Sequence, residues 1–383
     1  MAMLFGNVML LTSDWQLLVR CGYVFELKVE KIEEYLSAVY KAGVKVSRVS
    51  VLGGGTDLKG FGYGLPYLVE FDADGVVKRA VLETMREEGF GHDHFSDRAA
   101  VLLWQHSTFN KLPRHVHSID VGSFATDCVT LRSLGDCCEF FILTEFVEGS
   151  PYHSDLDRIK DTGELINVDE ERCLALSDYL AAIHSMKNKD APNLYVRRIR
   201  DLNGHGEGIF GLTDSYASGL NYADQKFFVN FEKECIEWRW RLKQKTHRLS
   251  QVHGDFHPWN IIFRRGLDYT LLDRSRGEWG EPADDVGTMT VNYIIYSLQA
   301  FGRMNGPFLK LFLLFWRNYL DKTGDDEILS VVQPFYAWRS LVIASPIWYP
   351  DLSTDMRKRI LRFATRVLKA RKFDFEDVES YLT

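Results

Sequence analysis

HGDFHPWN, residues 253–260, places three side chains that can bind metals at every second position: His253, Asp255 and His257. On a β-strand, alternate residues share one face, so these three would form a metal site of the zinc type. Gly254 and Pro258 disfavour a regular strand, because glycine loosens the backbone and proline cannot donate to a strand ladder. We therefore predict a loop here, with the metal-binding strand of a hydrolase as the alternative.

The segment that follows, NIIFRRGLDYTLLD (260–273), predicts a β-hairpin centred on RRGLD. Asn260 opens its first strand and Asp273 closes its second, so strand pairing brings these two side chains together. Their amide and carboxylate oxygens suit Mg²⁺ better than zinc. Asp255 is then free to face a substrate hydroxyl, and one base with two Mg²⁺ ligands is what phosphoryl transfer needs.

HGDFHPWN followed by LLDRSRGEWGEPADDVG resembles the catalytic segment of the aminoglycoside phosphotransferase and choline kinase-like family, which has the protein-kinase-like fold. That family shows an H-x-D-x-x-x-x-N loop, an aspartate that ends the next strand, and a G-D-P-x-x-D segment that opens a helix. Matched position by position, the resemblance implies that Asp255 is the catalytic base and that His253 braces the catalytic loop. It also implies that Asn260 and Asp273 bind Mg²⁺ and that Asp285 is a structural acid.

Two further segments resemble the nucleotide site of the same family. The segment 143–149, within LTEFVEGSPY, resembles the hinge that receives adenine, and its expected contacts come from Thr144, Glu145 and Phe146. The glycine-dense segment 53–64, GGGTDLKGFGYG, lies where the phosphate-covering loop is expected, with these candidates: Gly53, Gly54, Gly55 and Lys59. The resemblance therefore implies ATP and Mg²⁺ as cofactors and leaves GTP open as a donor.

The order of the predicted elements indicates two lobes. Strand-like segments dominate up to about residue 148, and helical periodicity dominates after it. We predict an α+β, two-lobed protein-kinase-like fold, with a small antiparallel β-rich lobe at 1–148 and a larger, mainly helical lobe at 149–383. The first lobe is expected to bind the nucleotide, and the second to carry the catalytic loop and the acceptor site.

The composition is that of a soluble globular protein, with 46% hydrophobic and 26% charged residues. The formal charge of -7 and the dispersed basic residues argue against nucleic acid as a partner. The apolar N-terminus lacks the basic region and the cleavage site of a signal peptide. We expect a cytoplasmic enzyme that acts on a small-molecule hydroxyl substrate, with neither nucleic acid nor membrane as a partner.

The sequence departs from the family on the third strand, where a lysine normally contacts the nucleotide phosphates and pairs with a helix glutamate. The segment AVLETM places Glu83 there, and Lys78 or Arg79 replaces it only if the strand register shifts. Because an acid repels phosphates, we expect another cation to compensate. Lys59 is the first candidate, and Arg98 is expected to pair with Glu83 in a reversed ion pair.

Two segments are candidates for the acceptor site. Arg274 and Arg276 follow the second predicted Mg²⁺ ligand, and we expect them either to contact substrate or phosphate or to pair with Glu278 or Glu281. The glycine-rich segment 197–211 contains His205 and Glu207, which we predict to shape substrate recognition, with a tight surface loop as the alternative. The family resemblance does not choose among aminoglycosides, sugars and amino alcohols as acceptors.

Our prediction is an ATP-dependent small-molecule kinase that transfers the γ-phosphate to a hydroxyl. Two other functions stay open. Glu83 suggests a catalytically weak nucleotide-binding protein that regulates a partner, although the intact base and Mg²⁺ ligands favour catalysis. A metal-dependent hydrolase that uses His253, Asp255 and His257 predicts bound zinc, manganese or iron, and activity without ATP.

Overall fold

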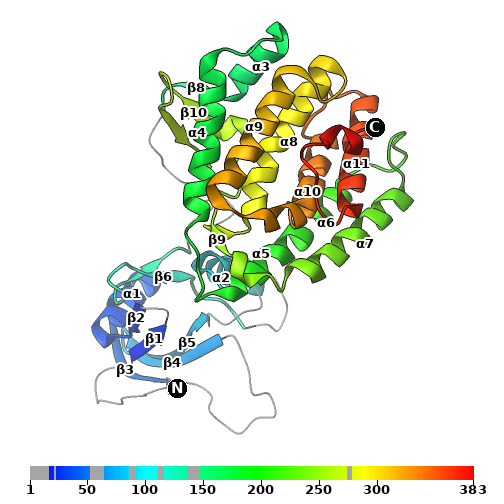
Figure 1. Ribbon diagram of the computed structural model, residues 1–383. Coiled ribbons are helices and arrows are strands. Elements are labelled where there is room, and N and C mark those ends of the chain that lie inside the picture. Colours follow the sequence, from blue (N-terminus) through cyan, green and yellow to red (C-terminus); the bar gives the residue numbers. More distant parts are fainter. Residues whose placement is uncertain are drawn as a thin grey trace, which may run out of the picture. The chain divides into compact units, whose positions relative to one another are not determined.

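The computed structural model describes residues 17–20, 23–51, 64–85, 92–110, 116–135, 147–273 and 278–383. The chain divides into two compact units, Met1–Leu143 and Thr144–Thr383 (Figure 1). The first contains a small antiparallel sheet and the second is mainly helical, so the architecture is α+β, as predicted.

The first unit is built on a three-stranded antiparallel sheet in the order β3–β4–β5. These strands span Val44–Val51, Gly64–Ala73 and Val76–Met85. A tight turn joins the last two, because Asp74 and Gly75 both adopt positive φ angles, which suits a two-residue hairpin. The unit also contains β1 (Leu17–Arg20), β2 (Tyr23–Glu26), α1 (Val29–Tyr40), α2 (Phe95–Phe109), β6 (Gly122–Phe124) and β7 (Leu131–Ser133).

Strand β5 carries the predicted departure from the family pattern. Its pairing with β4 is continuous, so the register is not shifted and Glu83 stays opposite Pro66 on the exposed side. Lys78 lies on the other face, with its ammonium 5.5 Å from the centre of the Tyr40 ring, and Arg79 lies 3.4 Å from a Glu70 oxygen. Neither basic side chain therefore occupies the position of Glu83 on β5.

The second unit contains nine described α-helices around one hydrophobic core. They are α3 (His153–Thr162), α4 (Asn167–His184), α5 (Pro192–Gly204), α6 (Ile209–Asp214), α7 (Gln225–Leu242), α8 (Pro282–Phe301), α9 (Gly306–Thr323), α10 (Gln333–Ala344) and α11 (Thr354–Lys369). Short strands join them: β8 (Ser150–Pro151), β9 (Ser250–Gln251), β10 (Ile261–Phe263), β11 (Tyr269–Leu271) and β12 (Trp279–Gly280). Single 3₁₀ turns lie at Thr246–Arg248, Pro258–Asn260, Asp326–Ser330 and Val378–Tyr381.

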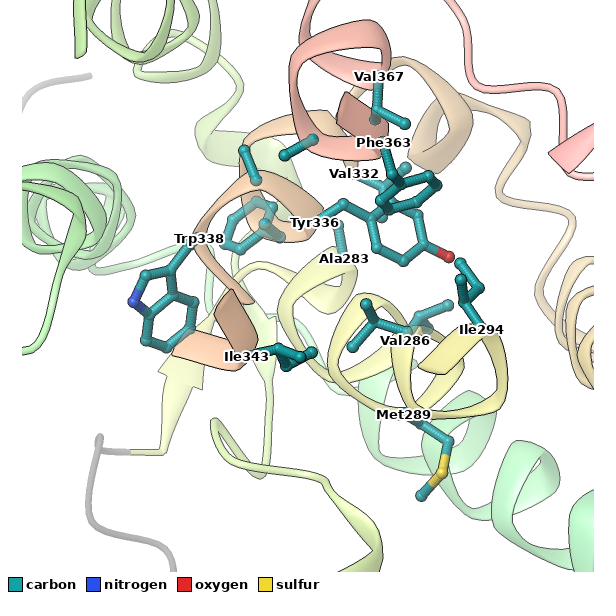
Figure 2. Close-up of a cluster of buried hydrophobic side chains, with 14 of the residues drawn as sticks. Ala283, Val286, Met289, Ile294, Val332, Tyr336, Trp338, Ile343, Phe363 and Val367 are labelled. Carbon is teal, nitrogen blue, oxygen red and sulfur yellow. The ribbon is translucent and has the colours of Figure 1, made fainter. Parts of the chain in front are cut away.

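Helix α8 is the centre of this unit. Its residues from Pro282 to Leu298 are all buried, as expected for a helix that packs against neighbours on every side. Figure 2 shows side chains of α8 that meet side chains of α10 and α11, among them Val286, Tyr336 and Phe363. This packing fixes α10 against the N-terminal half of α8.

Among the described residues, no helix combines the length and the hydrophobicity that crossing a membrane requires.

Candidate active site

The stretch 252–257 is a loop, as predicted. Gly254 has a φ of 86°, which side chains rarely tolerate, and Pro258 starts the 3₁₀ turn that ends at Asn260. His257 caps this turn, because its Nδ1 accepts a hydrogen bond from the backbone N–H of Trp259. The local sequence therefore turns the chain immediately after Asp255 and carries it into β10.

Asp285 braces the loop from the first turn of α8. Its two carboxylate oxygens accept hydrogen bonds from the backbone N–H groups of His253 and Gly254, each at 2.7 Å. His184 of α4 contacts the same carboxylate through Nε2 at 3.1 Å and bonds to Tyr319 through Nδ1. Burial alone raises the pKa of Asp285, but the bonds from His184 and His253 outweigh it and hold that pKa below its usual value. Asp285 is thus buried and bonded to the backbone of the loop, and its predicted role as a structural acid stays a prediction.

The hairpin after the loop joins Asn260 to the end of β11. Ile261 pairs with Leu271, and the backbone N–H of Leu272 donates to the carbonyl of Asn260 at 2.8 Å. Asn260 ends the 3₁₀ turn rather than opening β10, and Asp273 lies two residues beyond β11 with a φ of 51°. The register therefore brings the two predicted Mg²⁺ ligands to the same end of the hairpin, outside the regular ladder.

Asp255 has a partner that the sequence did not indicate. Its Oδ1 accepts a 2.6 Å hydrogen bond from Nη2 of Arg339, in the middle of α10. Its Oδ2 lies 3.5 Å from Nε2 of His257. His253 contributes too, because its Nδ1 accepts from the backbone N–H of Asp255 at 3.3 Å. The carboxylate of Asp255 is therefore buried and already paired with a cation.

A second buried carboxylate lies close to Arg339. Asp284 is fully buried, and its Oδ1 lies 4.0 Å from Nη2 of Arg339. Its Oδ2 accepts a short hydrogen bond from Arg198 of α5. Four charges of alternating sign therefore run from α5 through α8 and α10 to the catalytic loop. Each carboxylate has a cation beside it, which offsets the cost of burial.

Tyr349, in the segment after α10, lies in the field of the same pair. Burial raises the pKa of its phenol, and the charges of Arg339 and Asp255 act on it in opposite directions. Arg357 of α11 holds this segment, because its guanidinium donates to the carbonyls of Ala344 and Tyr349 at 2.8 and 2.6 Å. The backbone of Tyr349 is thus held by Arg357, and its phenol lies in the field of Arg339 and Asp255.

Within the glycine-rich segment 197–211, only residues 205–208 form a loop between α5 and α6, and His205 and Glu207 are exposed there. The carbonyl of Glu207 accepts a 2.8 Å hydrogen bond from Nε1 of Trp338, the neighbour of Arg339 on α10. Both interpretations from the sequence, a surface loop and a contributor to the acceptor site, are compatible with this position. The structure brings the loop to the helix that carries Arg339.

Beside the loop 252–257, a cavity of about 230 Å³ opens between α4 and the hairpin of β10 and β11. Its lining is apolar on several sides and ends at His253 and Asp273; the remaining residues are Tyr179, Ile183, Gln251, Val252, Leu271 and Leu272. Asp273, which is one of the two predicted metal ligands, thus lines the same cavity as these apolar side chains.

Several predicted site residues lie outside the described residues. They are the phosphate-loop candidates Gly53, Gly54, Gly55 and Lys59, the hinge residues Thr144, Glu145 and Phe146, and Arg274 and Arg276. Arg98 is described, and its guanidinium donates to the carbonyls of His92 and Asp93. Its expected ion pair with Glu83 stays a prediction.

The hydrolase alternative depends on three ligands in one place. Among the described residues, no group of three His, Cys, Asp or Glu side chains is arranged to hold a metal ion. In the loop itself, Nδ1 of His253 and Nδ1 of His257 each accept a backbone N–H instead. The geometry favours the interpretation in which Asp255 acts with the hairpin.

Sequence reasoning missed Arg339, Asp284 and Arg198. Arg339 had a signal, since it is the one charged residue in the otherwise apolar helix QPFYAWRSLVIA. Asp284 had a weaker one, as the neighbour of the structural acid in the pair Asp284–Asp285. Neither signal names a partner, because Arg339 and Asp255 are 84 positions apart.

A model of the phosphotransferase enzyme family matches residues 112–304. No curated protein matches the chain.

Solved structures that resemble the chain include an amicoumacin kinase in complex with AMP-PNP and Ca²⁺, at 15% identity and a TM-score of 0.41, over 86% of this chain and 91% of that one. A choline kinase from Streptococcus pneumoniae is 14% identical with a TM-score of 0.34, over 88% and 98%. An ethanolamine kinase from Plasmodium vivax is 13% identical with a TM-score of 0.35, over 90% and 82%.

Proposed function

The chain belongs to the phosphotransferase enzyme family, and from this premise we propose that it transfers the γ-phosphate of ATP to the hydroxyl of a small molecule. The family assignment confirms the predicted protein-kinase-like fold class and the predicted enzyme class, a phosphotransferase with an alcohol group as acceptor. The donor, the metal, the acceptor and the roles of single residues belong to the proposal.

The observation that carries the proposal is the arrangement of Asp255, Asn260 and Asp273 around one loop and hairpin. Asp255 is held from three sides by Arg339, His253 and the side-chain amide of Asn260, which donates to its backbone carbonyl at 3.1 Å. A general base must lie within hydrogen-bond reach of the proton that it takes, in a fixed orientation. We assign Asp255 as the group that accepts the proton of the acceptor hydroxyl while its oxygen attacks the γ-phosphorus.

The donor set at the hairpin end fits Mg²⁺. Because the Nδ2 atom of Asn260 donates to the carbonyl of Asp255, the amide oxygen of Asn260 is left as an acceptor. Strand pairing places the exposed Asp273 at the same end of the hairpin. Hard oxygen ligands, few in number, are typical of Mg²⁺ that also binds water and phosphate. When bound, Mg²⁺ would neutralise charge on the transferred phosphate. Asn260 and Asp273 would hold it.

The cavity between α4 and the hairpin supports a nucleotide donor. Ile183, Val252 and Leu271 offer apolar surface suited to one face of a purine, next to the carboxylate of Asp273. Contacts from Thr144, Glu145 and Phe146, and from the glycine loop with Lys59, are part of this proposal. The choice of ATP over GTP is part of it as well.

The acceptor is proposed only as a small molecule with a hydroxyl group. Proteins of similar structure include kinases named for amicoumacin, choline and ethanolamine, and these compounds define the first panel to test. His205 and Glu207 are exposed beside α10 and are our candidates for recognising the acceptor.

The test is a transfer assay with [γ-³²P]ATP and Mg²⁺ against a panel of hydroxyl compounds that includes choline, ethanolamine and aminoglycosides. The proposal predicts a labelled phosphate ester with at least one compound and no labelling when EDTA removes the metal. Purified protein that binds ATP with Mg²⁺ but labels no compound would favour the regulatory alternative. Release of product from a hydrolase substrate without ATP would contradict the proposal.

A further inference from the structure

Arg339 is a buried cation in an apolar helix, and such a group is costly unless it is paired. We propose that Arg339 is a positioning residue for phosphoryl transfer, which fixes the carboxylate of Asp255 so that its Oδ2 faces the acceptor hydroxyl. The inference rests on the proposed function, in which Asp255 is the base. It adds a residue from α10, far from the catalytic loop in the sequence.

The first argument is the geometry of the contact. Nη2 of Arg339 lies 2.6 Å from Oδ1 of Asp255, and both side chains are about nine-tenths buried. A carboxylate has only two oxygens, so a hydrogen bond that occupies one of them sets the direction of the other. Oδ2 then points toward the side of the loop where Nε2 of His257 lies at 3.5 Å.

The second argument is that Arg339 is itself held. Asp284, fully buried, places Oδ1 4.0 Å from the same Nη2 atom, and Arg198 binds the other oxygen of Asp284. The guanidinium plane also lies over the Trp338 ring, 4.1 Å from its centre. A planar guanidinium with a buried acid beside it and a ring against it has fewer orientations available than a flexible lysine ammonium.

The third argument is the rigidity of α10. The hydroxyl groups of Tyr336 and Thr290 are 2.6 Å apart and join α10 to α8, and Tyr336 packs against Phe363 of α11 (Figure 2). Nε1 of Trp338 donates to the carbonyl of Glu207. Side chains that position a catalytic group need such support, since loose support leaves the group misplaced.

A purely structural role for Arg339 is the competing explanation. Arg339 neutralises two buried carboxylates, so its removal destabilises the fold under either explanation. Only the positioning role predicts that Asp255 turns and that kcat falls in a variant that is still folded. The tests therefore separate orientation and turnover from stability.

The first test compares crystal structures of the wild type and the Arg339→Met variant, with Arg339→Lys as a second variant if the first does not fold. We expect the Asp255 carboxylate to rotate away from its wild-type position in both. A carboxylate that keeps its position without the guanidinium overturns the proposal. Because this test needs no turnover, it stands even if no acceptor is found and the proposed function fails.

The second test measures turnover of MgATP with water as the acceptor. For Arg339→Ala we expect kcat to fall on the order of a hundredfold, the size of effect that a misplaced catalytic group produces. The KM for ATP should not change, and added guanidinium should restore part of kcat. Arg339→Lys should fold and keep an intermediate kcat.

The matched control is Arg317→Ala on α9, where an exposed guanidinium pairs with Glu376 at 2.6 Å. It should keep wild-type kcat and show no response to guanidinium. A folded Arg339→Ala variant with wild-type kcat overturns the proposal, as does a loss that guanidinium does not restore. A wild type without ATP turnover would count against the proposed function instead.

Discussion

Two short loops of the second unit, 252–257 and 205–208, are built in opposite ways. In the first, His253 and Asp255 are buried; the backbone is fixed by N–H groups that donate to Asp285, and the Asp255 side chain by a hydrogen bond from Arg339. In the second, His205 and Glu207 are exposed, and the loop is held through its backbone, for example by the Glu207 carbonyl.

Under the proposed function, this difference suits two tasks. Proton transfer needs one geometry, and buried charges with defined partners provide it. Recognition of an acceptor needs side chains that can vary without unfolding the protein, and exposed positions on a backbone-held loop allow this. The comparison predicts that changes in the first loop damage stability and turnover, and that changes in the second alter the acceptor.

Asp285→Asn should have the largest effect on stability. Its carboxylate accepts two backbone N–H groups and contacts His184, and an amide can accept only on one side. We expect a loss of about 3–5 kcal/mol in the free energy of unfolding. Urea denaturation measures it, with exposed Asp268→Asn, paired with Arg264, as the control. If the two variants were equally stable, the hydrogen bonds of Asp285 to the loop would not stabilise the fold as described.

Gly211→Ala tests whether the second loop is backbone-held. A Cβ at Gly211 would overlap the backbone of Gly206, whereas a Cβ at Gly204 would meet no atom within 4 Å. We expect Gly211→Ala to lower the free energy of unfolding by about 1–3 kcal/mol, as overpacking does. Gly204→Ala is the matched control and should be neutral or slightly stabilising. Thermal unfolding that ranks the two variants in the opposite order contradicts this description.

His205→Ala and Glu207→Ala should act on the acceptor. Both side chains are exposed, so the fold should tolerate their removal. We expect kcat/KM for the acceptor found in the panel to change by about tenfold or less, the size of one lost hydrogen bond. The KM for ATP should stay at the wild-type value. If steady-state kinetics show no change for the acceptor, the loop is only structural.

Glu327→Gln should have the smallest effect, on stability alone. Burial raises the pKa of Glu327, but bonds from Lys245 and His247 outweigh it and lower that pKa from 4.5 to about 2. Because the pKa is lower in the folded state, the carboxylate stabilises the fold above pH 4.5 and this contribution is lost as the pH falls toward 2.

The effect is modest, since the Glu327 side chain is about one-third exposed. Denaturation of Glu327→Gln and wild type should differ at neutral pH and converge in acid. A difference that is independent of pH would show that the charge is not responsible.

Much of the catalytic region could be predicted from local sequence. Gly254 and Pro258 disfavour a strand, RRGLD predicts the turn of the hairpin, and strand pairing around this turn brings Asp273 back to Asn260. These inferences need only short-range geometry, and the structure confirms the loop and the hairpin. The roles of Asn260 and Asp273 in binding Mg²⁺ stay predictions.

The partner of Asp255 could not be predicted in the same way. Its contact with Arg339 exists because α10 packs against α8, and it depends on side chains such as Val286 and Tyr336 that carry no information about Asp255 (Figure 2). An arginine inside an apolar helix predicts some buried acid, but many acids in the chain fit. Tertiary packing chooses among them, so Arg339 could not be named from the sequence. The expectation that Asp255 faces a substrate hydroxyl stays a prediction.

The measurement that tests the central claim most directly is turnover by Asp255→Asn. Asn keeps the size of the side chain but cannot take a proton, so we expect kcat to fall by roughly 10²–10⁴-fold. The affinity for MgATP, measured by calorimetry, should stay at the wild-type value. An Asp255→Asn variant that is folded and turns over like the wild type would contradict the assignment of Asp255 as the base.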